Sequence, residues 1–186
     1  SDKTGTLTRN EMTIRRIATP AGVVLVTGVG YAPVGEFLVD GESADPSSDV
    51  REVLRAGVLA SDARVLIGED GRWRVEGDPT EGALIVAGEK AGLGQAELNE
   101  EQPRRHEIAF TSERRRMTTL HATAAGAMVA YSKGAVETVL PACGAWLLAG
   151  REAPLTAADR EAIGAAEREM AAAGLRVLAL ARKARA

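Results

Sequence analysis

An aspartate close to the first residue stands in a segment suited to phosphoryl chemistry, Ser1-Asp2-Lys3-Thr4-Gly5-Thr6-Leu7-Thr8. A carboxylate can attack a phosphoryl group, and the charge of Lys3 offsets the negative charge that gathers there. Gly5 lets the backbone approach a phosphate closely because it has no side chain. The residue types are therefore compatible with phosphoryl chemistry at Asp2. A surface turn of the same composition is the alternative, but the ordered run of eight residues argues against chance.

A second cluster combines an aromatic residue with a basic run, Phe110-Thr111-Ser112-Glu113-Arg114-Arg115-Arg116-Met117. An aromatic ring can stack on a planar base, and arginines attract phosphate. Taken alone, the cluster is also what an ordinary hairpin with a charged turn would show. Arg114 and Arg116 are interpreted as solvated charge.

Two further segments carry candidate binding residues. In Gly77-Asp78-Pro79-Thr80-Glu81, Asp78 can cap a helix that begins at Pro79, and Glu81 can complete a capping box. Capping alone explains half of this pattern. Lys133 ends an apolar strand and precedes the small residues Gly134 and Ala135, a pattern that suits a pocket open to a planar ligand. A lysine in an ordinary strand-to-helix turn fits the residues equally well.

These segments together resemble those of P-type ATPases, and most closely the calcium-pump branch. The matching elements are Asp-Lys-Thr-Gly-Thr, Gly-Asp-Pro-Thr-Glu, Phe-Thr followed by charges and Met, Lys-Gly-Ala and Gly-Leu-Arg-Val-Leu-Ala, in family order from residue 2 to about 181. Val136 stands where the family commonly has Pro, and Ser112 where a basic residue often contacts the nucleotide. Soluble dehalogenase-class phosphatases have an acid two residues after the acceptor aspartate, where this chain has Thr4.

The resemblance implies a function for the individual residues. Phe110 would stack on adenine, and the other nucleotide contacts would be Glu81, Ser112, Arg115, Lys133, Gly134 and Arg176, with Arg176 at the β-phosphate. Asp2 would be the catalytic acceptor, flanked by Lys3 and Thr4. Mg²⁺ would be held by Asp2 and by the backbone carbonyl of Thr4 in the complete protein. The implied cofactors are thus ATP and Mg²⁺.

The resemblance also implies the organisation of the chain. The expected fold is α+β, a twisted antiparallel β-sheet flanked by helices. Residues 1–11 would belong to the phosphorylation domain, 12–182 would form the nucleotide-binding domain, and 183–186 would lead back to the phosphorylation domain. The parent would be a cation-transporting pump, with calcium favoured by branch, and this chain a cytoplasmic piece of that membrane protein. Its partners would be the phosphorylation, actuator and transmembrane domains. The isolated piece should be soluble and monomeric, and should bind ATP without turning it over. A stand-alone nucleotide-binding regulatory module, a dehalogenase-class phosphatase and an interaction protein are the alternatives.

Composition limits the other function classes. The 186 residues, 45% of them hydrophobic, are enough for one domain with a core, which must be mainly Ala, Val, Leu and Ile because aromatics are 3%. Net charge is −3 and there is no long basic stripe, so nucleic acid is not an expected partner. One cysteine and two histidines predict neither a disulfide framework nor a zinc site, and indicate a reducing compartment. No apolar run approaches the roughly 18 residues of a membrane span.

The remaining pattern predicts the supporting elements. Strands over 12–18 and 23–26 should form a hairpin, and a helix should cover about 49–62. A helix capped by Thr156 and Asp159 should stop at Gly174, and a strand should follow directly over 175–181. Gly28-Val29-Gly30-Tyr31-Ala32-Pro33-Val34-Gly35 is not read as a dinucleotide fingerprint, because its third glycine is late and Pro33 interrupts a helix start.

Overall fold

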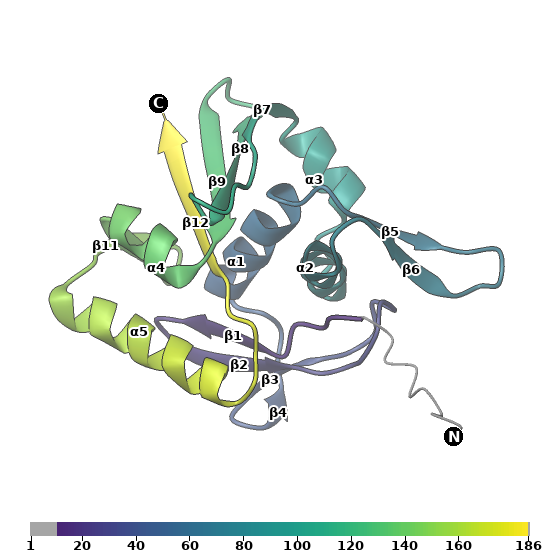
Figure 1. The fold of residues 1–186 in the computed structure, drawn as a ribbon, viewed down its shortest axis with the longest axis horizontal. Coiled ribbons are helices and arrows are strands. Elements are labelled where there is room, and N and C mark those ends of the chain that lie inside the picture. The colour runs from purple at the N-terminus through teal and green to yellow at the C-terminus, as the bar shows by residue number, and fades with distance from the viewer. Residues whose placement is uncertain (1–10, 186) are drawn as a thin grey trace.

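The computed structural model describes residues 11–185, and the predicted acceptor segment with Asp2, Lys3 and Thr4 lies outside them. Within this range the strands form two four-stranded sheets and two hairpins, and every strand pair there is antiparallel. Five helices accompany them in the described part of the chain. The predicted α+β class with antiparallel pairing is confirmed, with the strands divided among separate sheets (Figure 1).

The first sheet, here called the N-terminal sheet, contains the predicted hairpin. Its strands, in spatial order, are β1 (Arg16–Thr19), β2 (Gly22–Val26), β3 (Phe37–Val39) and β4 (Glu42–Ser43). The turn between the first two strands ends at Gly22, whose φ of 130° suits a residue without a side chain. The first strand is shorter than predicted because its pairing with β2 begins only at Arg16.

The second sheet, here called the C-terminal sheet, has the order β12-β9-β8-β7. Its strands are β7 (Arg104–Ile108), β8 (Arg116–Ala122), β9 (Met128–Gly134) and β12 (Ala179–Arg185). Burial alternates along β8, so one face of the sheet is covered. The last strand starts four residues later than predicted, because its partner β9 ends at Gly134, which pairs with Ala179.

The structure also contains two separate hairpins: β5 (Arg64–Ile67) with β6 (Trp73–Glu76), and β10 (Ala145–Leu148) with β11 (Arg151–Pro154). The helices are α1 (Ser48–Leu59), α2 (Pro79–Lys90), α3 (Gln95–Glu101), α4 (Val136–Val139), which a 3₁₀ turn (Leu140–Ala142) extends, and α5 (Ala157–Ala172). The predicted capping box of Thr156 and Asp159 is confirmed by both of its hydrogen bonds, and Gly174 follows the helix with a φ of 77°.

Helix α1 forms the centre of the molecule and contacts both sheets as well as α2 and α3 (Figure 1). Its Val50, Leu54 and Leu59 are almost completely buried. The helix packs closely on α2 because small residues stand at the crossing, where a Cβ on Gly88 would lie 2.5 Å from a methyl carbon of Val58. The core consists mainly of aliphatic side chains, as the scarcity of aromatics predicted.

Candidate functional site

The candidate residues of the C-terminal sheet gather at one of its ends. Because the strands are antiparallel, β7 ends, β8 begins, β9 ends and β12 begins on the same side. Gly134 pairs with both Arg116 and Ala179. The loop 109–115 and the link 175–178 therefore meet there. This register brings together Phe110, Ser112, Arg115, Lys133, Gly134 and Arg176 from distant parts of the sequence.

Glu81 joins this end of the sheet from the first turn of α2. Asp78 caps that helix as predicted, accepting hydrogen bonds from the backbone N–H groups of Thr80 at 2.7 Å and Glu81 at 3.3 Å. The reciprocal half of the predicted capping box is wrong. The Glu81 carboxylate instead accepts the backbone N–H groups of Asp62 at 2.7 Å and Ala63 at 2.9 Å. These two donors follow the end of α1, where the chain offers them no helical partner.

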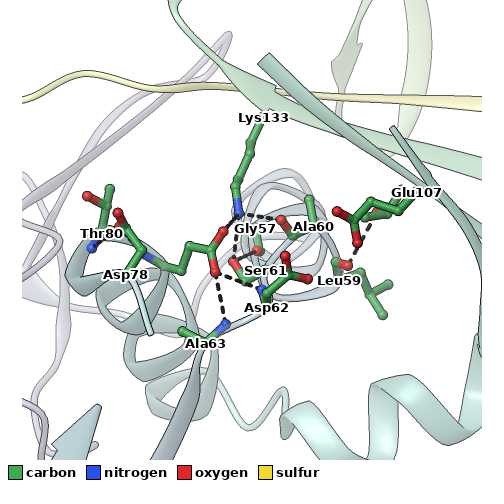
Figure 2. A network of polar contacts seen from close by, with 12 residues as sticks. Gly57, Leu59, Ala60, Ser61, Asp62, Ala63, Asp78, Thr80, Glu107 and Lys133 are labelled. Atoms are coloured by element: carbon green, nitrogen blue, oxygen red, sulfur yellow. Dashed lines mark hydrogen bonds and ion pairs between the residues drawn. The ribbon is translucent and has the colours of Figure 1, made fainter. Parts of the chain in front are cut away.

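Lys133 forms an ion pair with Glu81 in which both side chains are largely buried, with 11% and 14% of their surfaces exposed. Its Nζ also donates to the carbonyl of Ala60 and contacts the Ser61 hydroxyl at 3.4 Å. Figure 2 shows the side chain reaching from the sheet toward Ala60 and Ser61. Burial lowers the pKa of Lys133, and the Glu81 carboxylate acts in the opposite direction. The lysine is therefore held by three acceptors in a partly desolvated place.

The segment that receives these contacts, from the last residue of α1 to the residue before β5 (59–63), is here called the α1–β5 connection. Further contacts reach it from α3 and from strands β7 and β8 of the sheet. Gln95 donates to Ala63 at 2.9 Å, Thr119 donates to the carbonyl of Leu59 at 3.3 Å, and Arg104 donates to Leu59 at 2.9 Å and Ser61 at 2.8 Å. The connection is thus fixed by five different elements.

Sequence reasoning missed this connection and the residues that hold it. Arg104 lies in the run Arg104-Arg105-His106-Glu107, which on sequence has the pattern of a solvated charged face. Ser61 and Asp62 follow a helix and carry no motif. The partners are separated by 18 to 73 positions, so no local spacing could have grouped them.

Phe110 lies in the loop between β7 and β8, at an open part of the candidate site. Its side chain is 58% exposed although it is one of two phenylalanines in the chain. The loop that carries it is a compact turn, in which the backbone N–H of Arg115 donates to Thr111 at 2.7 Å and that of Arg114 to the Thr111 hydroxyl at 3.1 Å. Ser112 is exposed in the same turn. The aromatic ring is therefore presented to solvent by an ordered loop.

The arginines of this loop differ in their partners. Arg115 pairs with Glu137 at 2.5 Å, with both side chains 55% exposed. Arg116 and Arg114, interpreted from sequence as solvated charge, donate to the backbone carbonyls of Thr138 at 2.8 Å and Ala109 at 3.1 Å. The hydrogen bond of Arg114 is thus exposed and lies within the loop, whereas Arg116 makes a partly buried contact with α4 that the interpretation as solvated charge did not include.

Gly134 has a packing reason for being glycine. A Cβ at this position would lie 2.5 Å from the carbonyl oxygen of Arg115 and 2.6 Å from the Cβ of Arg116. Such distances cannot be accommodated without a backbone shift. The glycine therefore lets the end of β9 approach the Phe110 loop closely.

Arg176 is exposed in the link between α5 and β12. Its charge acts on Asp78: burial disfavours the ionised carboxyl, but hydrogen bonds from Thr80 and Glu81 and the charge of Arg176 together lower the pKa of Asp78. The charge of Arg176 therefore acts on Asp78, the N-cap residue of α2.

The candidate side chains combine an exposed aromatic ring with basic and acidic groups. Among residues 11–185 no three His, Cys, Asp or Glu side chains are grouped so that they could hold a metal. The predicted Mg²⁺ ligands Asp2 and Thr4 lie outside that range. Two surface hollows, beside Arg15 and beside Lys90, are lined by other residues than the candidates. No helix in the described part of the chain has the length and hydrophobicity needed to cross a bilayer.

The structure is an antiparallel α+β domain in which an exposed aromatic ring, a buried Lys–Glu pair and several arginines lie toward one end of a sheet. The family described as "P-type ATPase, cytoplasmic domain N" matches residues 49–185, and the chain belongs to this family. This membership confirms the resemblance of the sequence motifs.

Curated relatives agree with the family. The chain is 40% identical over 183 residues to "Probable cation-transporting ATPase F" of Mycobacterium tuberculosis (strain ATCC 25618 / H37Rv), covering 96% of this chain and 20% of the relative. It is 40% identical over 191 residues to "Cation-transporting ATPase pma1" of Synechocystis sp. (98% and 20%). It is 38% identical over 187 residues to "Calcium-transporting ATPase type 2C member 1" of Homo sapiens (97% and 20%). The chain thus spans about a fifth of the length of these relatives.

Proposed function

We propose that this chain is the ATP-binding domain of a cation-translocating P-type ATPase and that it holds the adenine end of the nucleotide. The observation that carries the proposal is the convergence of Phe110, Lys133 and Glu81 at one end of the C-terminal sheet. An exposed ring beside a polar pair offers stacking to a base and hydrogen bonding to its edge.

Each side chain has a proposed part in recognition. Phe110 stacks on adenine, and the aliphatic stem of Lys133 lines the pocket with Gly134 behind it. The Glu81 carboxylate accepts from the exocyclic amine of adenine, whereas guanine has an acceptor oxygen in that place. Adenine should therefore be preferred over guanine.

The phosphates would lie toward the arginines. Arg176 is the proposed β-phosphate contact, and the action of its charge on Asp78 supports a place near the start of α2. Arg115 is exposed and can exchange Glu137 for a phosphate oxygen, while Ser112 offers a hydroxyl in the same turn. These contacts would orient the γ-phosphate away from the adenine pocket.

In the complete pump, an Asp2 carboxylate oxygen would attack the γ-phosphorus while the bond to the β–γ bridging oxygen breaks and ADP leaves. Mg²⁺ bound by Asp2 and the Thr4 carbonyl would offset phosphate charge, and Lys3 would add a further positive charge. Thr4 stands where a dehalogenase-class phosphatase has its acid/base, so the aspartyl phosphate would persist. Residues 1–11 would accordingly belong to the phosphorylation domain.

The wider setting follows from the same proposal. The chain would work on the cytoplasmic side of a membrane pump, together with its phosphorylation, actuator and transmembrane domains. Calcium is the proposed ion, because relatives named as calcium-transporting are among those that match. The chain by itself should be a soluble monomer that binds ATP weakly and does not turn it over.

The proposal is tested by titrating the chain with ATP and with GTP while amide shifts are followed by NMR. Shifts confined to Glu81, Phe110, Lys133 and Arg176, and larger for ATP, are expected. No shifts at millimolar nucleotide would refute the proposal in favour of an interaction module. Phosphate release by the isolated chain at a pump-like rate would contradict the expected lack of turnover.

A further inference from the structure

Arg104 contacts the α1–β5 connection at several points, although it belongs to none of the sequence motifs. Its guanidinium donates to the carbonyls of Leu59 and Ser61 and pairs with the carboxylates of Asp62 and Glu107. Three of these partners belong to the α1–β5 connection: Leu59 and Ser61 contribute backbone carbonyls, and Asp62 contributes its side chain. The side chain of Arg104 is 25% exposed, so these contacts are partly shielded from water.

The strand that carries Arg104 is built to direct it inward. Arg104 pairs with His121 and His106 with Leu120, so Arg105 is an extra residue that forms a β-bulge. Directly paired residues share a face of the sheet, and the side chain of His121 is completely buried. The register therefore directs Arg104 to the covered face, where α1 ends.

The carbonyl groups at the end of α1 receive positive charge from other elements of the fold. Its last turn contains no basic residue, although helix carbonyls carry partial negative charge there. Arg104 and Lys133 supply that charge from two strands and divide the carbonyls between them. Arg104 donates hydrogen bonds to the carbonyls of Leu59 and Ser61, and Lys133 donates to the carbonyl of Ala60.

We infer that Arg104 is a positioning residue of the nucleotide site, which holds the α1–β5 connection so that its carbonyl and amide groups orient Lys133 and Glu81. Arg104 fixes Ser61, whose neighbours Asp62 and Ala63 donate to Glu81. The guanidinium touches no proposed ligand contact and acts through the backbone between them. This inference rests on the proposed nucleotide-binding function.

The charged groups around Lys133 make its pKa a second measurement, separate from the stability of the fold. Glu81 faces it from α2, Asp62 from the connection and Arg104 from β7. Removing the charge of Arg104 should raise the pKa of Lys133, which the side-chain carbon and proton shifts of Lys133 report in an NMR titration. Arg104→Lys keeps the charge but loses the forked donor geometry.

The experiment measures the ATP dissociation constant and the Lys133 titration in the wild-type chain, R104Q and R104K. The matched control is R105Q, which makes the same change at the exposed bulge residue next to Arg104. We expect R104Q to weaken ATP binding by roughly 2- to 30-fold. R104K should weaken it less and leave the Lys133 titration near that of the wild type, and R105Q should change neither.

Two failures are distinguishable. If the wild-type chain binds no ATP, the proposed function is wrong. If it binds ATP but R104Q binds equally well, or if R105Q weakens binding as much as R104Q, the inference about Arg104 is overturned. Should R104Q not fold, R104K decides, because wild-type affinity in that variant would show that the forked contacts with Leu59 and Ser61 do not position the site.

Discussion

The two sides of the candidate site are built in opposite ways. On one side, the buried ion pair of Lys133 and Glu81 is fixed through the α1–β5 connection, which five elements contact. On the other side, Phe110 is 58% exposed on a turn that is hydrogen-bonded within itself and to Ala135 and Thr138. Buried charges must be paired because their desolvation is costly, whereas an aromatic ring can stay exposed at little cost. The comparison indicates a rigid polar side and an open side that a ligand would cover.

The polar side extends into the core through a small network. His121 is completely buried, with one ring nitrogen 2.8 Å from the carbonyl of Gln102 and the other 3.0 Å from the hydroxyl of Thr119. Thr119 in turn donates to Leu59 in the α1–β5 connection. In the described part of the chain no buried side-chain nitrogen or oxygen lacks a hydrogen-bond partner. Changes on this side should therefore alter stability as well as binding, whereas changes on the open side should alter binding with little effect on stability.

The largest effect on stability is expected from Lys133→Met. The substitution leaves the Glu81 carboxylate buried without its cation, which should cost roughly 3 kcal/mol of unfolding free energy. Urea unfolding measures this loss, and Lys183→Met on an exposed position of β12 is the matched control. The double variant with Glu81→Met should lose less than the sum of the two single variants. Additive losses would show that the pair is not coupled.

Gly134→Ala should give the next largest loss. The added Cβ would collide with the carbonyl of Arg115, and overpacking of this kind costs roughly 1–3 kcal/mol. Gly144→Ala is the control, because a Cβ there meets no atom within 4 Å. Thermal or urea unfolding of both variants checks the prediction. Equal stability of the two would mean that β9 and the Phe110 loop can separate without cost.

The buried histidine predicts a dependence of stability on pH. Burial lowers the pKa of His121 from its ordinary value of 6.5, although the hydrogen bond with Gln102 acts in the opposite direction. Between the lowered folded pKa and 6.5 the unfolded chain binds more protons, so stability rises with pH across that window and falls on acidification. Urea unfolding at pH 7 and at steps below 6.5 should show this decline. His121→Gln should flatten the decline, and the exposed His106→Gln should preserve it.

The smallest effect on stability is expected from Phe110→Ala. An exposed ring contributes little to folding, so the unfolding free energy should change by no more than about 0.5 kcal/mol. Its binding effect should be large, because stacking on a base contributes roughly 1–3 kcal/mol of affinity. Ile108→Ala, at a 44% exposed position at the end of β7, is the control for the ATP titration. Unchanged ATP affinity in the Phe110 variant would show that the ring of Phe110 does not contribute to nucleotide binding.

Local patterns in the sequence predicted the elements well. The caps at Asp78 and Thr156 and the hairpin through Gly22 were recoverable because capping and turn chemistry act within a few residues. The start of the last strand was not recoverable, since it depends on where β9 ends. The second half of the Asp78 capping box failed for a similar reason, because a distant lysine and two backbone amides bind Glu81 more favourably.

The sequence by itself determined the family of this chain, its aliphatic core and the residue types able to bind a nucleotide, because motifs, composition and short-range geometry are contained in the order of residues. Only the tertiary structure decided which candidates are buried and paired, as with Lys133 and Glu81, and which face solvent, as with Phe110. It also brought in Arg104 and the α1–β5 connection. Antiparallel pairing and helix packing bring such residues together across 18 to 73 positions, a proximity that depends on the whole fold.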